Sequence, residues 1–179
     1  MSNATRVLVV IDMQNDFISG ALGTPEARAI VEPITQKITD FEGEVIYTLD
    51  THDERYLETQ EGRFLPIPHC IKGSKGWESP NPIANALAAR RAVAVEKTAF
   101  GSTRLAHYLA RSNASRPIDS IELVGVCTDI CVVSNALLLK ASLPDTPVTV
   151  DAKLCAGSTP AHHEAALTTL SCCQVIVNR

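Results

Sequence analysis

The sequence lacks the features that mark several protein classes. It has no run of about 18 apolar residues, so we expect no transmembrane helix and no membrane partner. Its 16 lysines and arginines are outnumbered by 20 aspartates and glutamates, and without a basic surplus we expect no nucleic-acid partner. The apolar stretch of a signal peptide is missing before the first strand-like run, which predicts a cytoplasmic protein.

Familiar catalytic and cofactor-binding motifs are missing as well. The chain has no G-x-S-x-G nucleophile elbow, no phosphate-binding loop ending in G-K-S/T and no G-x-G-x-x-G fingerprint. Its six cysteines include no C-x-x-C redox pair, since three residues separate Cys127 from Cys131. In a reducing compartment such cysteines are packed, catalytic or metal-bound. His162 and His163 lack the spacing of a zinc-protease helix, and we expect both at the surface.

What the chain does contain is typical of one globular domain spanning residues 1–179. Hydrophobic residues make up 45% and charged residues 20%, and 179 residues can bury a sufficient core. Short apolar runs alternate with stretches of helical periodicity, and this alternation predicts crossover units around a parallel sheet. The expected fold is an α/β, Rossmann-like, three-layer α-β-α domain with a six-stranded, mostly parallel sheet.

The apolar patterns define the expected elements. The predicted strands are residues 6–11, 44–49, 92–95, 120–126, 147–150 and 174–177. The predicted helices are residues 27–41, 83–89, 103–111, 129–141 and 160–170, with Ser102 and Thr159 as N-caps. Residues 51–82 are rich in proline and glycine and show no clear periodicity, and a stretch of that length is usually functional or disordered. Its aromatic, histidine and cysteine content favours an ordered, functional loop.

Three polar residues follow three of the predicted strands. Asp12 follows VLVVI, Lys97 follows AVAVE, and Cys131 lies in the first turn of the helix predicted after the fourth strand. Because the carboxyl ends of parallel strands meet at one edge, we expect these side chains to lie together. The carboxylate would take the thiol proton, and the lysine and the helix N-terminus would stabilise the anions. Taken singly, each residue has a structural explanation as a cap, a solvated lysine or a packed thiol.

A second polar cluster lies at the end of the second predicted strand and in the loop. Asp50 and His52 are two residues apart, which places both on one face of an extended chain, and Glu61 and His69 follow. Histidines and carboxylates suit a zinc, manganese or iron ion with open positions. Exposed loop histidines that bind no metal would give the same pattern.

Five segments resemble the isochorismatase-like cysteine hydrolases, and within them the nicotinamidase (pyrazinamidase) branch. They are VVIDMQNDF (9–17), LDTH (49–52), LPIPHCIKGSKGWE (65–78), VEKTAFGST (95–103) and VGVCTDICV (124–132). The resemblance implies a catalytic triad of Asp12, Lys97 and Cys131. It also implies a cis peptide before Cys127 and an oxyanion hole made by the backbone N–H groups of Cys127 and Cys131. The thiol at position 127 is unusual for the family.

The resemblance further implies a metal site and a ring pocket, with the loop at about 51–82 binding both metal and substrate. The implied ligands of one divalent ion, zinc first with manganese or iron as alternatives, are Asp50, His52, His69 and Glu61, with Glu58 competing for the fourth place. Phe17 and Trp77 fall where the family places aromatic walls for a flat ring, and Phe100 is a candidate third wall.

The reaction that the resemblance implies is amide hydrolysis, converting nicotinamide to nicotinate and ammonia through a thioester on Cys131. The alternative enzyme is a cysteine hydrolase of another small amide or of a ureido or carbamoyl compound. Two alternatives are not hydrolases: a non-catalytic binding protein, and a redox sensor that uses Cys127 and Cys131. The expected partner is a small-molecule amide, and homo-oligomerisation is left open.

Overall fold

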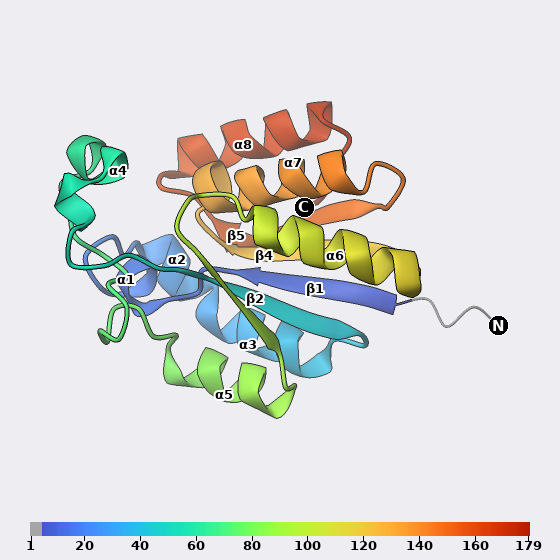
Figure 1. Ribbon diagram of the computed structural model, residues 1–179, viewed down its shortest axis with the longest axis horizontal. Coiled ribbons are helices and arrows are strands. Elements are labelled where there is room, and N and C mark those ends of the chain that lie inside the picture. Colours follow the sequence, from blue (N-terminus) through green and yellow to red (C-terminus); the bar gives the residue numbers. More distant parts are fainter. Residues whose placement is uncertain (1–4) are drawn as a thin grey trace.

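A six-stranded sheet forms the centre of the computed structural model, which describes residues 5–179 (Figure 1). The strands are β1 (Thr5–Ile11), β2 (Glu44–Asp50), β3 (Val93–Lys97), β4 (Ile118–Val126), β5 (Val148–Ala156) and β6 (Ile176–Asn178). Their order is β3-β2-β1-β4-β5-β6, and every neighbouring pair is parallel. The predicted α/β class and strand number are confirmed, and the sheet is wholly rather than mostly parallel.

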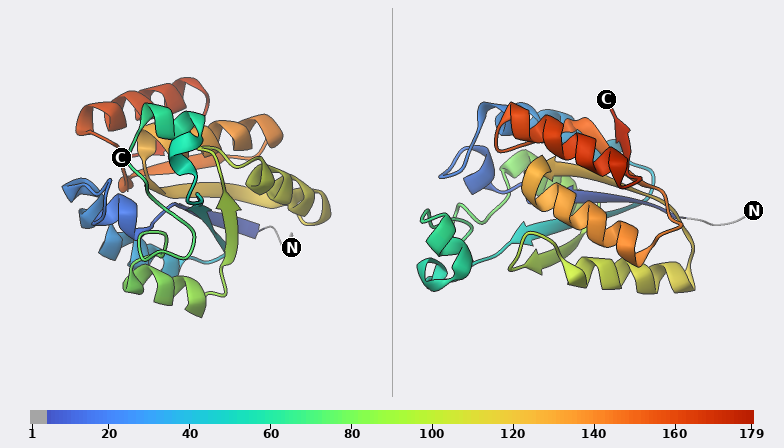
Figure 2. Two further views of the ribbon diagram at one scale, coloured as in Figure 1. Left: turned by 60° about the vertical axis from the view of Figure 1, so that its left-hand side comes forward. Right: turned by 90° about the horizontal axis from the view of Figure 1, so that it is seen from above.

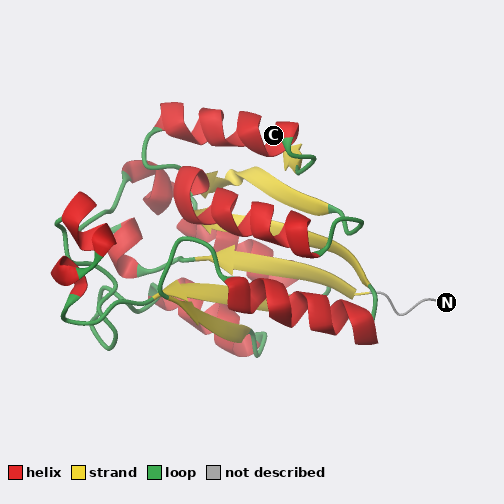
Figure 3. Ribbon diagram, turned by 45° about the horizontal axis from the view of Figure 1, so that its top comes forward, coloured by secondary structure: helices red, strands yellow, loops and turns green. Residues whose placement is uncertain are grey.

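Helices cover both faces of the sheet, giving three layers (Figures 2 and 3). One face carries α1 (Asn15–Ile18), α2 (Pro25–Ala29), α3 (Val31–Asp40) and α5 (Asn81–Ala89), and the other carries α6 (Thr103–Ser115), α7 (Val133–Ser142) and α8 (Pro160–Cys172). No helix among residues 5–179 is long and apolar enough to cross a membrane.

Strand β1 shows why the sequence forms such a sheet. Val7, Val9 and Ile11 pack into the core below α6, α7 and α8, while Leu8 and Val10 pack into the core below α3 and α5. Every one of these side chains is at most 1% exposed, so the strand is apolar on both faces from Val7 to Ile11. Each buried aliphatic side chain stabilises the fold by roughly 1.5–3 kcal/mol relative to an exposed one.

Two predicted helices begin or continue differently in the structure. The helix predicted for residues 27–41 is divided at Ile30, which ends α2 and precedes α3, because Thr24 and Pro25 start a separate short helix. The helix predicted for residues 129–141 begins with a π-helical turn, η2 (Thr128–Val132), before α7. The expected N-caps are confirmed, since Ser102 and Thr159 accept hydrogen bonds from the first turns of α6 and α8.

The segment predicted as a loop is ordered and contains two short helices that the periodicity did not reveal. These are a 3₁₀ turn, η1 (Tyr56–Glu58), and α4 (Gln60–Phe64), which Thr59 caps. Figure 1 shows α4 standing away from the sheet, on the side where the strands end. The loop therefore projects from the edge at which parallel sheets bind their ligands.

Candidate active site

The ends of β1, β3 and β4 bring three of the predicted site residues together. The Nζ atom of Lys97 lies 2.8 Å from Asp12 Oδ2 and 3.5 Å from Cys131 Sγ. Asp12 is completely buried, and Lys97 and Cys131 are each 5% exposed. A carboxylate, an ammonium and a thiol therefore share one enclosed cluster, which can exchange protons with little competition from water.

Asp12 is held immediately beyond β1 in a left-handed backbone conformation, with φ at 47°. Its N–H donates to Thr48 Oγ1 at 3.2 Å, and the Thr48 hydroxyl donates to Asp12 Oδ1 at 2.6 Å. Burial raises the pKa of Asp12 above its ordinary value, against the lowering effect of the Lys97 charge. Asp12 is accordingly a better proton acceptor than an exposed aspartate.

Cys131 lies in η2, the turn between β4 and α7. The Val126–Cys127 peptide is cis, as the family resemblance implied. The N–H groups of Ile130 and Val132 both donate to the carbonyl oxygen of Cys127, which closes the turn around the nucleophile. Burial and the nearby Asp12 charge raise the pKa of Cys131 well above that of a free thiol, although Lys97 acts in the opposite direction. The resting thiol is therefore protonated and needs a base.

A glycine allows β4 to deliver this turn beside Asp12. Gly125 pairs with Ile11 of β1 and has a φ of +120°. A Cβ atom at this position would lie 2.1 Å from the Ile11 carbonyl oxygen, so any other residue would push the two strands apart. The close approach of β1 and β4 places the residues that follow them in one site.

The four metal-ligand candidates also meet. Asp50, His52, Glu61 and His69 each offer a ligand atom within 4.8 Å of the others. Both histidine Nε2 atoms lie 3.7 Å from Glu61 Oε1, and His52 Nε2 lies 3.0 Å from Asp50 Oδ2. Glu61 belongs to this set and Glu58 does not.

The donor chemistry of this set fits a divalent ion. The Nδ1 atom of His69 is 2.9 Å from the Ile67 carbonyl oxygen, a contact that places the proton on Nδ1 and leaves Nε2 free to ligate. Burial and the charge of Asp50 raise the pKa of Glu61 above its ordinary value, as expected where two carboxylates lie close together. Two imidazoles and two carboxylates are ligands that zinc, manganese and iron all accept.

Asp50 belongs to both clusters. Its Oδ1 atom lies 3.2 Å from Lys97 Nζ, while its Oδ2 atom faces His52 and His69. The contact with Lys97 follows from the register of β2 and β3, which pairs Asp50 with Lys97. Burial alone would raise the pKa of Asp50, but hydrogen bonds with the two histidines and the Lys97 charge hold it well below its usual range. The two predicted clusters are therefore parts of one charged network.

The three predicted aromatic wall residues are less closely gathered. Phe17 is 8% exposed, and its ring packs 5.4 Å from that of His69. The Trp77 indole donates to Thr51 Oγ1 at 2.9 Å and borders a groove next to α5. Phe100, 45% exposed, lines a different cavity that reaches His52 and Glu61. Trp77 and Phe100 thus line different hollows, and the ring pocket that the resemblance implied stays a prediction.

Two buried polar residues that support the site were missed in the sequence. The Gln14 amide donates to the carbonyl oxygens of Asp50 and Trp77, and its oxygen accepts the Asp50 N–H. The Asn135 amide donates to the carbonyl oxygens of Cys131 and Phe100. Asn135 gives a weak sequence signal, as an amide within the mainly apolar run VVSNALLL, whereas Gln14 stands among other polar residues in DMQND and gives none. They fix the backbone on both sides of the cluster.

One histidine prediction was wrong. His162 is exposed as expected, but His163 is half-buried, and its Nδ1 atom lies 2.8 Å from Thr128 Oγ1 in η2. Nearby, the Ser158 hydroxyl donates to Asp129 Oδ2 at 2.6 Å. Hydrogen bonds therefore connect the start of α8 to the turn that carries Cys131.

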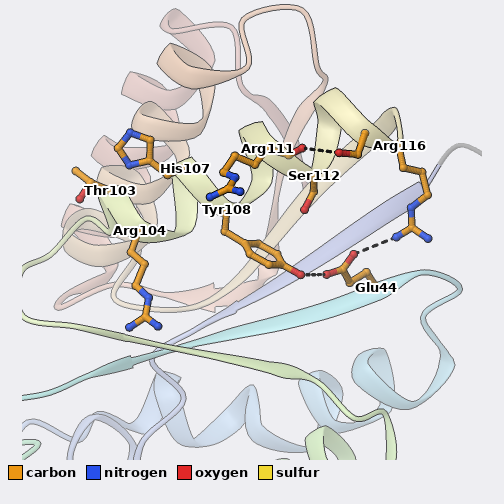
Figure 4. A pocket seen from close by; sticks show the side chains of 9 residues that line it. Glu44, Thr103, Arg104, His107, Tyr108, Arg111, Ser112 and Arg116 are labelled. Atoms are coloured by element: carbon orange, nitrogen blue, oxygen red, sulfur yellow. Dashed lines mark hydrogen bonds and ion pairs between the residues drawn. The ribbon is translucent and has the colours of Figure 1, made fainter.

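Another groove, of about 880 Å³, lies along α6 and contains none of the predicted site residues (Figure 4). Glu44 accepts a hydrogen bond from the Tyr108 hydroxyl at 2.8 Å and pairs with Arg116 at 3.3 Å. Arg104 and His107 project from the same helix (Figure 4). Exposed pairs of this kind contribute little, and we do not assign the groove to the active site.

Comparisons with known proteins agree with this geometry. The sequence is 28% identical over 148 residues to the nicotinamidase/pyrazinamidase of Mycobacterium tuberculosis, covering 73% of this chain and 76% of that protein. The crystal structure of pyrazinamidase of Pyrococcus horikoshii in complex with zinc matches with a TM-score of 0.78 and 26% identity, covering 98% of this chain and 99% of that one. N-carbamoylsarcosine amidase from Thermoplasma acidophilum matches with a TM-score of 0.76 and 28% identity, covering 98% and 96%.

The family assignment rests on nearly the whole chain. The sequence model of the Isochorismatase domain matches residues 6–178, which include all six strands except the first residue of β1. The fold is shared with the pyrazinamidase of Pyrococcus horikoshii along nearly the full length of both chains. The protein belongs to the isochorismatase family and is a hydrolase of that family acting on amides.

Proposed function

We propose that the protein is a nicotinamidase, which hydrolyses nicotinamide to nicotinate and ammonia. The observation that carries the proposal is the joining of two clusters by Asp50, which contacts Lys97 on one side and the histidines on the other. One cluster offers a nucleophile, and the other offers metal ligands beside it. An amide attached to a nitrogen-containing ring offers its carboxamide carbon to the nucleophile and its ring nitrogen to a metal ion held by the ligand cluster.

The first half of the proposed reaction forms a thioester. Asp12 takes the proton of the Cys131 thiol, and the thiolate attacks the carboxamide carbon. Lys97, 3.5 Å from the sulfur, stabilises the thiolate while the proton is on Asp12. The backbone N–H groups of Cys127 and Cys131 are the proposed donors to the oxyanion. Asp12 then returns the proton to the amide nitrogen, and ammonia leaves.

The second half releases the acid. Asp12, again ionised, takes a proton from a water molecule as the water oxygen attacks the thioester carbon. The bond between that carbon and Cys131 Sγ breaks, and Asp12 gives the proton back to the sulfur. Nicotinic acid leaves and loses its proton to the solvent to become nicotinate, and the enzyme regains its thiol and its carboxylate. The raised pKa of Asp12 suits a group that accepts and returns a proton in both halves.

We propose that Asp50, His52, Glu61 and His69 hold one zinc ion, since this donor set fits and the pyrazinamidase of Pyrococcus horikoshii is described in complex with zinc. When bound, the ion would supply a Lewis acid that takes the ring nitrogen of the substrate as a ligand. Neighbouring groups orient the ligands. The backbone carbonyl of Ile67 fixes the His69 ring, and the Gln14 side chain fixes the backbone of Asp50.

The second candidate is hydrolysis of a carbamoyl compound. The observation in its favour is the match to N-carbamoylsarcosine amidase, whose 28% identity is comparable with that of the pyrazinamidase. The four-residue metal-ligand set favours the nicotinamidase proposal, because a carbamoyl group attached to an aliphatic chain has no ring nitrogen to bind there.

Ammonia release from purified protein tests the two candidates directly. Nicotinamide and N-carbamoylsarcosine are supplied in parallel, and Cys131→Ala measures the background. We expect ammonia from nicotinamide and little from N-carbamoylsarcosine. The reverse preference would replace the first proposal by the second, and equal ammonia from the parent and Cys131→Ala would contradict both.

A further inference from the structure

Several exposed apolar side chains lie on the projecting loop and in the segment after β3. Of seven large hydrophobic residues that are exposed within residues 5–179, four lie on the projecting loop or directly after β3. These are Leu57, Phe64, Ile67 and Phe100, with exposed fractions of 53%, 85%, 39% and 45%. Apolar side chains gathered in this way commonly mark a binding surface.

Two of these residues face one cavity of about 570 Å³ that adjoins the catalytic network. Phe64 and Leu65 line it from the projecting loop, and Phe100 and Ile130 line it from the sheet edge. Its inner end reaches His52 and Glu61, both metal-ligand candidates. Ile130 belongs to η2, so the cavity is lined by the turn that carries the nucleophile as well as by two of the metal-ligand candidates.

The size and lining of the cavity suit a larger ligand than nicotinamide. Its volume is within the range of pockets that enclose drug-sized molecules, whereas nicotinamide is a single ring with one carboxamide. With the ring at the histidines and the carboxamide at Cys131, a substituent on the ring would meet Phe64 and Phe100. Both side chains would then lose contact with water.

We propose that this cavity is an outer subsite for an apolar substituent on the ring, so that the preferred substrates are aromatic amides larger than nicotinamide. The inference rests on the proposed function and deepens it. Phe64, the most exposed large apolar side chain at the rim, is the residue that would determine this preference.

The test compares nicotinamide with nicotinamides that carry a methyl or a phenyl group at ring position 4 or 5. The kcat/KM for ammonia release is measured for each amide with the parent protein, Phe64→Ala and Leu57→Ala. We expect at least one substituted amide to exceed nicotinamide roughly tenfold, and Phe64→Ala to lower that ratio by a similar factor. Leu57→Ala, exposed on the same segment but outside the cavity lining, should leave the ratio as it is.

The outcomes separate this inference from the proposed function. Hydrolysis of nicotinamide with no gain from any substituent, or an unchanged ratio in Phe64→Ala, overturns the outer subsite alone. Absence of turnover with every pyridine amide overturns the proposed function and the subsite together. Light scattering adds a further outcome: a dimer of the parent that Phe64→Ala dissociates would show that a second copy covers Phe64, and would also overturn the subsite.

Discussion

The two halves of the candidate site are built in different ways. Asp12 and Lys97 stand at strand ends, and Cys131 follows β4 within a turn closed by backbone hydrogen bonds. Glu61 and His69 belong to the projecting loop, where short helices and single polar contacts replace the sheet. The nucleophilic half is thus positioned by the fold, whereas the metal-ligand half depends on how the loop is held.

Specific polar contacts hold the loop in place. The backbone N–H of Cys70 donates to Asp16 Oδ2 at 2.8 Å, and the N–H of His52 donates to the Cys70 carbonyl at 3.0 Å. Trp77 is tied to Thr51 through its indole N–H. A bound cation would add ligand bonds that join Glu61 and His69 to Asp50. We therefore expect the metal to stabilise the loop more than the sheet.

The largest expected effect comes from removing the nucleophile. Cys131→Ala should lower kcat by at least about 10³-fold, because the remaining groups cannot form a thioester. Metal content should stay at the parent level, since the ligand half is untouched. Ammonia release and metal analysis are measured on the same samples, with Cys172→Ala, an exposed thiol, as control. Residual activity near that of the control would show that another group attacks the amide.

The next largest effect is expected from removing one metal ligand, which should weaken metal binding. His69→Ala should weaken metal binding by more than the 10–100-fold that loss of an outer-sphere partner typically costs. Metal content after dialysis and limited proteolysis of the loop are the measurements, and we expect faster cleavage between Asp53 and Pro68. His107→Ala, which changes a histidine on α6, is the matched control. Retention of a full equivalent of metal by His69→Ala would remove this residue from the ligand set.

A smaller effect is expected at the support of Asp12. Thr48→Val keeps the shape of the side chain and removes the hydroxyl that donates to Asp12 Oδ1. Hydrogen bonds to charged groups contribute about 1.5–3 kcal/mol, so kcat/KM should fall roughly 10–100-fold. Thr149→Val on β5 provides the comparison at a half-buried strand position away from the site. Equal rates for both variants would show that Thr48 does not orient Asp12.

The smallest effect is expected where α8 is fastened to the turn of Cys131. Ser158→Ala removes the hydroxyl bond to Asp129 Oδ2 but keeps the bond from the Ser158 N–H to Asp129 Oδ1. We expect the free energy of unfolding in urea to fall by about 1 kcal/mol. Ser115→Ala, at the exposed end of α6, should change it less. A loss of several kcal/mol would mean that the fastening contributes to the whole fold.

The strand-borne half of the site could be predicted because a short apolar run shows where a strand ends. The run before Asp12 and the run before Lys97 are enough to place both residues at one edge of a parallel sheet. The contact between Asp50 and Lys97 could not be predicted in this way, because it depends on the register of an edge strand. Register is set by packing across the sheet, which periodicity along one strand does not reveal.

The loop and the turn of Cys131 show a different limit. α4 has five residues, too few for helical periodicity to emerge, and the sequence left Glu58 in competition with Glu61 for the fourth ligand position. The π-helical turn was predicted as part of an α-helix because its apolar residues satisfy both patterns. The pocket expected from Phe17 and Trp77 rested on the family resemblance alone, because their contacts with His69 and Thr51 join positions far apart in the chain, which periodicity does not reveal.

Asp50 touches Lys97 with one carboxylate oxygen and the histidines with the other, so we expect a change at Lys97 or at His69 to affect the other residue through Asp50. The free-energy changes measured for separate substitutions of His69 and Lys97 should therefore not be additive in the double variant. A substitution that changes the preferred metal ion would therefore also change the surroundings of Lys97, the neighbour of the nucleophile.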